Sequence, residues 1–572
     1  MPSAPAGDAP DLVPPEDAAD LILVGGAVHT VDPLLPRAES IALSRGRIVA
    51  VGAAGDVLGF FRGAGTTVVD VGGRTVLPGF QDAHIHAPIG GAQTRQCDLH
   101  VASDRAGYLE VIAAYAASHP DVAWIRGGGW AMDRFPGGTP RKEDLDAIVA
   151  DRPVFLPNRD GHGAWVNSRA LELAGVTATT PDPADGRIER DPDGSPSGTL
   201  HEGAMHLVDR LIPALTPQEW EEGLLHGQAY LHALGITGWQ DAIVGGTYDS
   251  LDTYIRLTEQ GRLTARVVAA LWWERSRGAE QIADLVERRD RARASGFDAS
   301  SVKIMQDGVL ENFTAAVLDP YLDATGRPTD NRGISFVDPA LLAEVVPELD
   351  RLGFQVHFHA LAERAVRESL DAIAAARRAN GMNDLRHHIA HIQIVHPEDI
   401  PRFRAVGAVA NMQPLWATYE EQMTELTMPF IGEERSGWQY PFASLLRAEV
   451  PLAAGSDWPV TSADPLWEIA VAVHRRHPRS RGGRGRAAEE TFLPDERLTL
   501  DQAIEAFTLG SAYVNHLDDR VGSLAVGKEA DLVIVDRDLA TQDLEGLGEA
   551  RVECTIVAGR VVHAVGPFAG LT

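Results

Sequence analysis

The chain has 572 residues, of which 44% are hydrophobic and 23% are charged, and its formal net charge at pH 7 is −30. This composition is typical of a globular protein with a sizeable core and excludes a chain that is disordered throughout. The negative charge repels nucleic-acid phosphates and anionic lipid, so we expect neither nucleic acid nor a membrane among the partners.

Cysteine content and the N-terminal segment bear on the compartment. Cys97 and Cys554 are the only cysteines, too few for a disulfide framework or a thiolate metal cage, although a single bridge stays open. The first twenty residues carry neither the basic nor the apolar segment of a signal peptide. We expect a reducing, cytoplasmic location.

Short β-like runs stand at both ends of the chain. They are separated by Gly and Asp-Pro turn signals and occupy residues 21–29, 40–51, 66–71, 532–535, 554–557 and 561–563. We expect segments 1–75 and 520–572 to form one composite β-sandwich.

The region between these ends alternates apolar β-branched runs with amphipathic helical stretches, which is typical of repeated βα units. The predicted strands are residues 76–84, 235–241, 265–271, 301–306, 354–359, 388–391, 408–412 and 451–457. They predict an α/β fold with a TIM-like (β/α)8 barrel over residues 76–519. Roughly 150 residues separate the first two strands, so we expect an inserted subdomain at about 95–230. The Arg/Gly-rich run 478–486 predicts a solvated surface loop.

A His-x-His pair ends the first predicted strand. His84 and His86 are two residues apart, so in an extended chain both imidazoles point to one side and can reach one ion. Imidazole suits divalent zinc, iron or nickel. Taken alone, such a pair more often combines one packed and one solvated histidine.

Three further strand ends carry suitable ligands, namely His359, His391 and Asp457. Because the carboxyl ends of barrel strands converge on one mouth, these groups become neighbours of the His-x-His pair. His357 stays an alternative to His359. We expect His387 and His388 to be packed or surface imidazoles.

Lys303 lies among apolar residues of the fourth predicted strand. It is either a lysine that reaches the surface or an inward-pointing amine, since a buried ammonium beside a cation is costly. An inward amine is expected to be neutral or converted by carbon dioxide to a carbamate that bridges two metals.

These positions together resemble the amidohydrolase superfamily of metal-dependent hydrolases. More closely, the chain is similar to the YtcJ-like branch, amidohydrolase family 3, through GFQDAHIHAP, DGHGAWVNSRAL, VKIMQDG, HFHALAERAV and GSLAVGKEADLVIVD, which span almost the whole chain. The resemblance implies a metal-bearing barrel that hydrolyses an amide, N-acyl or N-formyl C–N bond of a small molecule. In one departure, Ala362-Glu363 stands where relatives tend to have Gly-Asp.

The resemblance also implies roles for single residues. His84 and His86 would bind one metal, His359 and His391 a second, and N6-carboxylated Lys303 would bridge them. Asp457 would be both ligand and catalytic base, and His391 would help to steer the substrate carbonyl. The expected metal is zinc, as one or two ions, and the family-level expectation is a homodimer.

Substrate contacts are expected from loops around the mouth. Trp130 and His162 lie in the predicted insertion, Trp416 follows the seventh strand and Trp458 follows Asp457. Aromatic residues there would form an apolar pocket, although packing between barrel and insertion stays open for each tryptophan.

Two alternative functions are kept. One is hydrolysis of a cyclic amide, carbamate or ester at the same site, because water activation does not itself select the leaving group. The other is a non-catalytic scaffold with the same fold, although such proteins usually lose the ligands that this chain retains.

Overall fold

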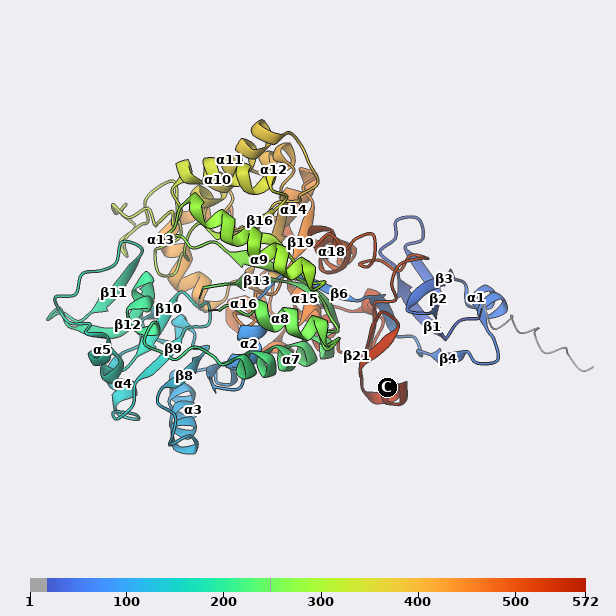
Figure 1. Cartoon of the computed structure of the whole chain (residues 1–572), viewed down its shortest axis with the longest axis horizontal. Coiled ribbons are helices and arrows are strands. Elements are labelled where there is room, and N and C mark those ends of the chain that lie inside the picture. The colour runs from blue at the N-terminus through green and yellow to red at the C-terminus, as the bar shows by residue number, and fades with distance from the viewer. Residues whose placement is uncertain (1–17, 247, 572) are drawn as a thin grey trace, which may run out of the picture.

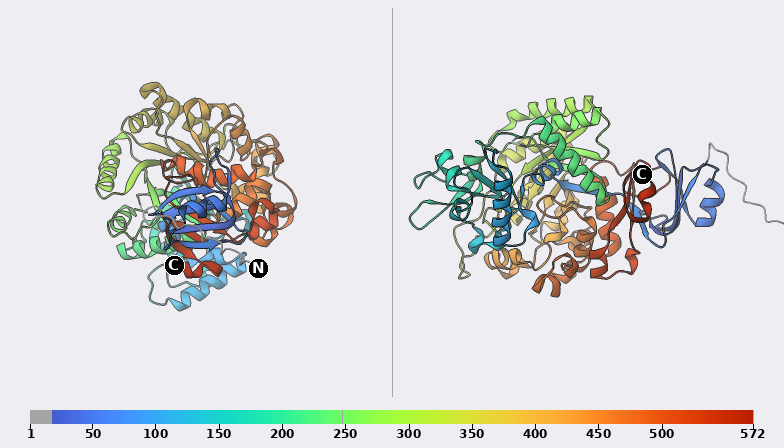
Figure 2. Two further views of the ribbon diagram at one scale, coloured as in Figure 1. Left: turned by 90° about the vertical axis from the view of Figure 1, so that its right-hand side faces the viewer. Right: turned by 90° about the horizontal axis from the view of Figure 1, so that it is seen from below.

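A computed structural model describes residues 18–246 and 248–571, and its strands form three sheets. The inserted sheet lies at one end of the molecule, the sheet built from both termini lies at the other, and the barrel lies between them (Figure 1). The views in Figure 2 give the same arrangement.

The terminal sheet has the strand order β22-β21-β20-β5-β1-β2-β3, with β4 also paired to β1. Its strands are β1 (Leu21–His29), β2 (Arg37–Ser44), β3 (Arg47–Gly52), β4 (Thr67–Asp70), β5 (Thr75–Pro78), β20 (Leu532–Val535), β21 (Val552–Val557) and β22 (Arg560–Ala564). Antiparallel pairing of β5 with β20 joins the two ends of the chain, and Ile41, Val76 and Ile534 share one core. Strands from both ends of the chain therefore share one sheet.

The barrel is a parallel sheet in the order β19-β18-β17-β16-β15-β14-β13-β6. Its strands are β6 (Phe80–Ile85), β13 (Ile236–Val244), β14 (Arg266–Trp272), β15 (Asp298–Met305), β16 (Gln355–Ala360), β17 (His388–His391), β18 (Val409–Met412) and β19 (Leu452–Ala454). β19 also packs against β6, so the eight strands nearly close a barrel and confirm the predicted fold class.

Helices cover the outside of the barrel. The main ones are α2 (Ala87–Gln93), α7 (Pro217–Ala233), α8 (Leu251–Glu259), α9 (Ile282–Ala294), α10 (Pro339–Arg351), α11 (Glu363–Asn380), α12 (Ile400–Val406), α14 (Phe442–Arg447) and α15 (Pro465–His474). In α11 the buried residues Val366, Leu370 and Ile373 recur every three to four positions and form one apolar face. α7 begins at a capping box formed by Thr216 and Glu219.

The insertion follows α2 and contains a sheet in the order β11-β12-β10-β9-β8-β7. Its elements are β7 (Cys97–Asp98), α3 (Arg105–Ser118), β8 (Ile125–Gly128), α4 (Lys142–Asp146), β9 (Val154–Pro157), β10 (Gly163–Val166), α5 (Ser168–Ala174), β11 (Gly186–Arg190) and β12 (Pro196–Glu202). The insertion begins after the carboxyl end of β6, and it therefore lies beside the carboxyl ends of the barrel strands.

The predicted strand 76–84 is two strands in the structure. β5 belongs to the terminal sheet and β6 to the barrel, with Gly79 between them. The Gly79 N–H donates to the carbonyl oxygen of Asp531 at 2.9 Å, and a Cβ at Gly79 would lie 2.5 Å from Thr237 Oγ1. The single predicted strand therefore contains a change of sheet at the crowded Pro78-Gly79 step.

Candidate metal centre

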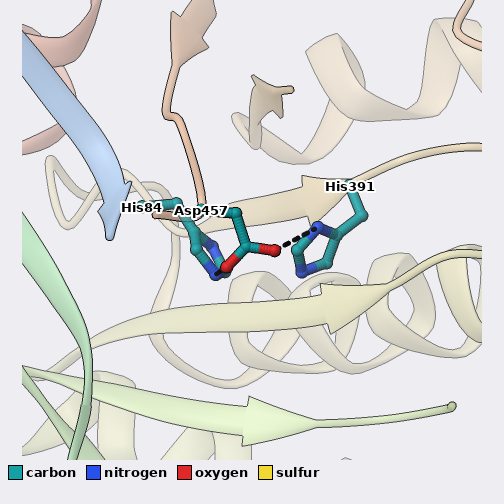
Figure 3. Close-up of side chains that lie close together, drawn as sticks. All are labelled: His84, His391 and Asp457. Carbon is teal, nitrogen blue, oxygen red and sulfur yellow. Dashed lines mark ion pairs between the residues drawn. The ribbon is translucent and has the colours of Figure 1, made fainter. Parts of the chain in front are cut away.

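The barrel strands bring the predicted ligands to one end of the sheet. In the parallel register Lys303 lies opposite His357, Met305 opposite His359, and Ala360 opposite His391. His84, His391 and Asp457 each offer one ligand atom, and these three atoms lie within 4.8 Å of one another (Figure 3). Residues more than 370 positions apart thus meet at one centre.

Asp457 faces both histidines of the His-x-His pair. Its Oδ1 lies 2.9 Å from His86 Nε2 and 3.3 Å from His84 Nε2, and its Oδ2 lies 4.0 Å from His391 Nδ1. Burial raises the pKa of Asp457, but the hydrogen bond and positive charge of His86 bring it below its usual value. The carboxylate is therefore ionised at neutral pH.

His359 and His391 form the other side of the cluster, with ring centroids 4.4 Å apart. His359 Nδ1 lies 3.4 Å from Asp307 Oδ1 but is not aligned for a hydrogen bond. Asp307 accepts the backbone N–H groups of Leu361, Ala362 and Ala316, and burial raises its pKa to about 7.

Sequence reasoning assigned Asp307 no role, although it is part of the quoted VKIMQDG motif. Its position two residues beyond β15 was the available signal. At this position its carboxylate anchors the turn that follows His359.

Lys303 points into the barrel, which excludes the surface alternative. The residue is 2% exposed, and its Nζ lies 3.3 Å from His357 Nε2 and 3.5 Å from His84 Nδ1. No carboxylate in the described part of the chain forms an ion pair with it. Burial lowers its pKa to about 7, so a substantial fraction of the amine is neutral at neutral pH.

The other histidines of these strands are held by hydrogen bonds. His357 Nδ1 and His388 Nε2 lie 2.6 and 3.0 Å from Gln240 Oε1, and His387 Nε2 lies 2.9 Å from Asp350 Oδ2. His387 and His388 are therefore packed, in agreement with the expectation. His357 lines the barrel, with its Nε2 2.9 Å from His84 Nδ1.

The chemistry of this donor set fits a divalent metal. Both ring nitrogens of His391 and the Nδ1 atoms of His86 and His359 are buried without a hydrogen-bond partner among residues 18–246 and 248–571. Buried polar atoms are normally paired, so these nitrogens are suited to a metal as their missing partner. Burial, with neighbouring positive charges, lowers the pKa values of His84, His359 and His391 well below the ordinary range. Their rings are neutral, as a metal ligand requires.

Two adjoining cavities lie beside this cluster. The smaller has a volume of about 80 Å³ and a mixed wall, in which Val309, Leu361, Trp416, Met423 and Tyr440 stand beside the charged residues Arg159, Asp160, Glu311 and Glu420. The larger, about 920 Å³, shares Trp416 and Val460 with it. The Trp416 ring also stacks on His391 with centroids 5.6 Å apart, so the smaller cavity adjoins the ligand cluster.

The basic run 478–486 is mostly exposed, as predicted, and it also borders a cavity. Arg481, Gly482, Gly483, Arg484, Gly485 and Arg486 all line the larger cavity. Ion pairing of Arg481 with Asp464, the N-cap residue of α15, helps to hold the run against the barrel.

Trp130 does not line either cavity, contrary to the expectation. Its ring is fully buried against Phe135 and Trp165 in the core of the insertion, and its indole N–H donates to Leu156 O at 2.8 Å. The packing alternative is the correct one, because the insertion needs an aromatic core of its own.

Trp458 combines packing with a place in the larger cavity. It is 6% exposed, stacks near Tyr230 with centroids 5.1 Å apart, and leaves no space for a Cβ at Gly90. It also lines the larger cavity. Trp458 therefore lines part of the larger cavity, although most of its ring is covered by packing.

His162 reaches the cluster from the insertion. Its ring centroid lies 5.4 Å from that of His359, and its Nδ1 lies 2.8 Å from Glu202 Oε1. Sequence reasoning missed Glu202 because no local motif contains it.

The barrel and its mouth of imidazoles and carboxylate define a metal-dependent hydrolase. A family model described as the amidohydrolase family matches residues 67–563, and the chain belongs to that family. This match confirms the family that the motifs resembled.

Relatives and a solved structure agree with this assignment. The chain is 32% identical to Protein LONG AFTER FAR-RED 3 of Arabidopsis thaliana, over 96% of this chain and 93% of that protein. It is 27% identical to N-substituted formamide deformylase of Arthrobacter pascens, over 94% and 97% of the two chains. A crystal structure of an uncharacterized metal-dependent hydrolase from Pyrococcus furiosus has a TM-score of 0.66 and 25% identity, covering 91% of this chain and 99% of that one.

In the part of the chain that the structure describes, no helix combines the length and apolar character needed to cross a membrane.

Proposed function

We propose that this protein hydrolyses a C–N bond of a small molecule, in an amide, N-acyl or N-formyl group, with a divalent metal held at the mouth of the barrel. The observation that carries the proposal is the set of buried, unpartnered ring nitrogens beside an ionised Asp457. Such a set suits zinc, which takes imidazole nitrogen and carboxylate oxygen as ligands.

We assign His84, His86, His359, His391 and Asp457 as the residues that would hold one or two ions. When bound, the metal would lower the pKa of a coordinated water and polarise the substrate carbonyl. Asp457 would act as the general base and return the proton to the leaving amine, and His391 would orient the carbonyl oxygen.

Lys303 is proposed to carry a carboxyl group on Nζ. The support is its burial, its position between His357 and His84, and the missing counter-ion among the described residues. A neutral amine adds carbon dioxide and releases a proton, and the resulting carbamate would place an anion beside the imidazoles of His84 and His357.

The substrate is proposed to be an amide with an apolar or aromatic substituent. The stacking of Trp416 beside His391 and the apolar part of the smaller cavity's wall, at Val309 and Leu361, favour such a group. The relative named N-substituted formamide deformylase makes N-substituted formamides the first compounds to test.

A non-catalytic role is the second candidate. It is favoured by one observation: the relative with 32% identity, Protein LONG AFTER FAR-RED 3, has a name that describes no reaction. Retention of the entire ligand set argues against it.

The deciding experiment combines metal analysis with a hydrolysis screen. Purified protein would be analysed for zinc, iron and nickel, then tested on formamides, N-acyl compounds, cyclic amides, carbamates and esters before and after chelation. Stoichiometric metal with chelator-sensitive turnover of formamides or N-acyl compounds supports the proposal. Turnover of esters alone would transfer the assignment to the alternative chemistry, and absence of both metal and turnover would favour the scaffold.

A further inference from the structure

A buried carboxylate of the insertion lies next to the proposed centre. Glu202 ends β12, its side chain is 3% exposed, and its backbone has φ = 51°, a left-handed conformation that is strained for a non-glycine residue. A strained, buried acidic residue persists only where its surroundings hold it in place.

Three hydrogen bonds converge on one oxygen of this carboxylate. Glu202 Oε1 lies 2.8 Å from His162 Nδ1, and it accepts from Thr314 Oγ1 at 2.9 Å and from Asn312 Nδ2 at 3.3 Å. Thr314 and Asn312 belong to the barrel loop between β15 and α10, so the carboxylate joins the insertion to the barrel. Burial raises the pKa of Glu202, but the positive charge and hydrogen bond of His162 lower it to about 2.

The backbone around Glu202 is close enough to the carboxylate that a side chain at Gly308 would clash with it. A Cβ at Gly308 would lie 2.5 Å from Glu202 Oε1. The backbone also fixes His162: its N–H donates to Asp160 Oδ1 at 2.9 Å, and its carbonyl oxygen accepts from Glu202 N at 3.1 Å. Hydrogen bonds therefore fix both the backbone of His162 and its imidazole ring.

The other ring nitrogen of His162 remains available. In the described chain no hydrogen bond to His162 Nε2 is found, and the side chain is 11% exposed. The ring lies beside that of His359, one of the proposed metal ligands, with centroids 5.4 Å apart. We infer that Glu202 is a positioning residue that fixes the ring of His162 beside His359, so that Nε2 contacts the amide of the bound substrate.

This inference rests on the proposed amide hydrolysis, and it gives the insertion a direct part in that reaction. The insertion supplies both His162 and Glu202, whereas the barrel supplies the metal ligands. Glu202 would act through His162 and would not touch the substrate itself.

The test uses Glu202→Gln in the full-length, zinc-loaded protein with N-benzylformamide as the probe. A glutamine keeps the size and one acceptor but loses the charge. We expect kcat to fall about 10- to 100-fold with KM within about twofold, because misplacing a supporting group costs on this scale. Zinc content should match that of the unmodified protein.

Two further variants separate positioning from a structural effect. Glu189→Gln is the matched control, because Glu189 pairs with His201 at 3.3 Å on the neighbouring strand of the same insertion. It should leave kcat unchanged. In a His162→Ala background, Glu202→Gln should cause no additional loss, since its effect passes through the missing ring. An additional loss there, or an unchanged kcat in Glu202→Gln alone, would overturn the inference.

A readout without turnover separates this inference from the proposed function. In ¹⁵N-histidine-labelled protein, the signals of His162, assigned by their loss in His162→Ala, should show a protonated Nδ1 that changes in Glu202→Gln. If the protein hydrolyses no amide but this change is seen, the positioning by Glu202 stands and the amide activity fails. If turnover is present and the signals are identical in both proteins, the positioning fails and the activity stands.

Discussion

The backbone N–H of Asp457 donates to the carbonyl oxygen of His84 at 2.7 Å. A second bond, from His86 N to Trp458 O at 2.9 Å, lies beside it. These bonds join the ends of the first and last barrel strands, so closure of the barrel itself sets the carboxylate against the His-x-His pair. The non-glycine φ of 56° at Asp457 is part of this geometry.

Asp457→Asn should separate metal binding from turnover. The amide keeps an oxygen for the ligand shell and the backbone bond to His84, but it cannot take a proton. We expect most of the metal to be retained while kcat falls by about 10²- to 10⁴-fold, the usual size of general base catalysis. Metal analysis and steady-state kinetics on an N-substituted formamide measure the two effects. Near-normal kcat in this variant would remove Asp457 from the role of base.

Reconstitution of the metal-free protein with zinc should depend on bicarbonate. If Lys303 carries a carbamate, protein reconstituted without bicarbonate should be less active and bind less zinc, and ¹³C-bicarbonate should give a carbamate signal by NMR. Lys303→Arg should remove the signal and the dependence, whereas Lys142→Arg, at a lysine paired with Asp191, should change neither. A dependence on bicarbonate that survives in Lys303→Arg contradicts the assignment.

Trp416 and Trp130 should respond differently to truncation. Trp416→Ala removes the ring that stacks on His391 and lines both cavities, so KM for an aromatic formamide should rise about 2- to 10-fold relative to an aliphatic one. Trp130→Ala should instead lower the free energy of unfolding by about 3 to 5 kcal/mol, because it opens a cavity in the core of the insertion. Kinetics with paired substrates and denaturant unfolding distinguish the two. A change in substrate preference for Trp130→Ala without loss of stability would contradict its assignment to the core.

The ligand set was accessible from the sequence because it depends on local signals. His84, His359 and His391 each stand at or near the end of a predicted strand, and the topology of a parallel barrel brings strand ends together. Asp457 likewise ends the last predicted strand, and Lys303 stands in the fourth; the family resemblance added their roles. Placing these residues does not require the conformation of any loop to be known.

Contacts between the insertion and the barrel could not be read in this way. Glu202 meets Thr314 across 112 positions, and neither residue belongs to a motif of known spacing. The change of sheet at Gly79 was missed although Pro78-Gly79 is a turn signal, because such a signal does not say which sheet the next strand joins. Trp130 was left open because a tryptophan in a loop-rich segment has the same pattern whether it packs inward or lines a pocket. In each case a tertiary contact decides what the local pattern leaves open.

Stability at low pH should depend on Asp350, which lies on α10 away from the strand ends that carry the ligands. Its side chain is fully buried and receives His387 Nε2 at 2.9 Å, Arg377 Nη1 at 3.0 Å and Asn380 Nδ2 at 2.7 Å. Burial raises its pKa, but the hydrogen bonds, that of His387 first, lower it to about 2. Because the folded state holds the carboxylate ionised below its ordinary value of 3.8, the stabilisation is complete above that value and is lost as pH falls toward about 2.

Asp350→Ala should therefore lower the free energy of unfolding at pH 7 by about 3 to 5 kcal/mol, because it leaves Arg377 and His387 buried without their partner. The difference between the variant and the unmodified protein should shrink between pH 4 and pH 2. Asp371→Ala, which removes an exposed partner of Arg402, is the control and should cost less than about 1 kcal/mol. Urea unfolding at a series of pH values measures both. A difference that stays constant down to pH 2 would show that Asp350 stabilises the barrel by packing and not by its charge.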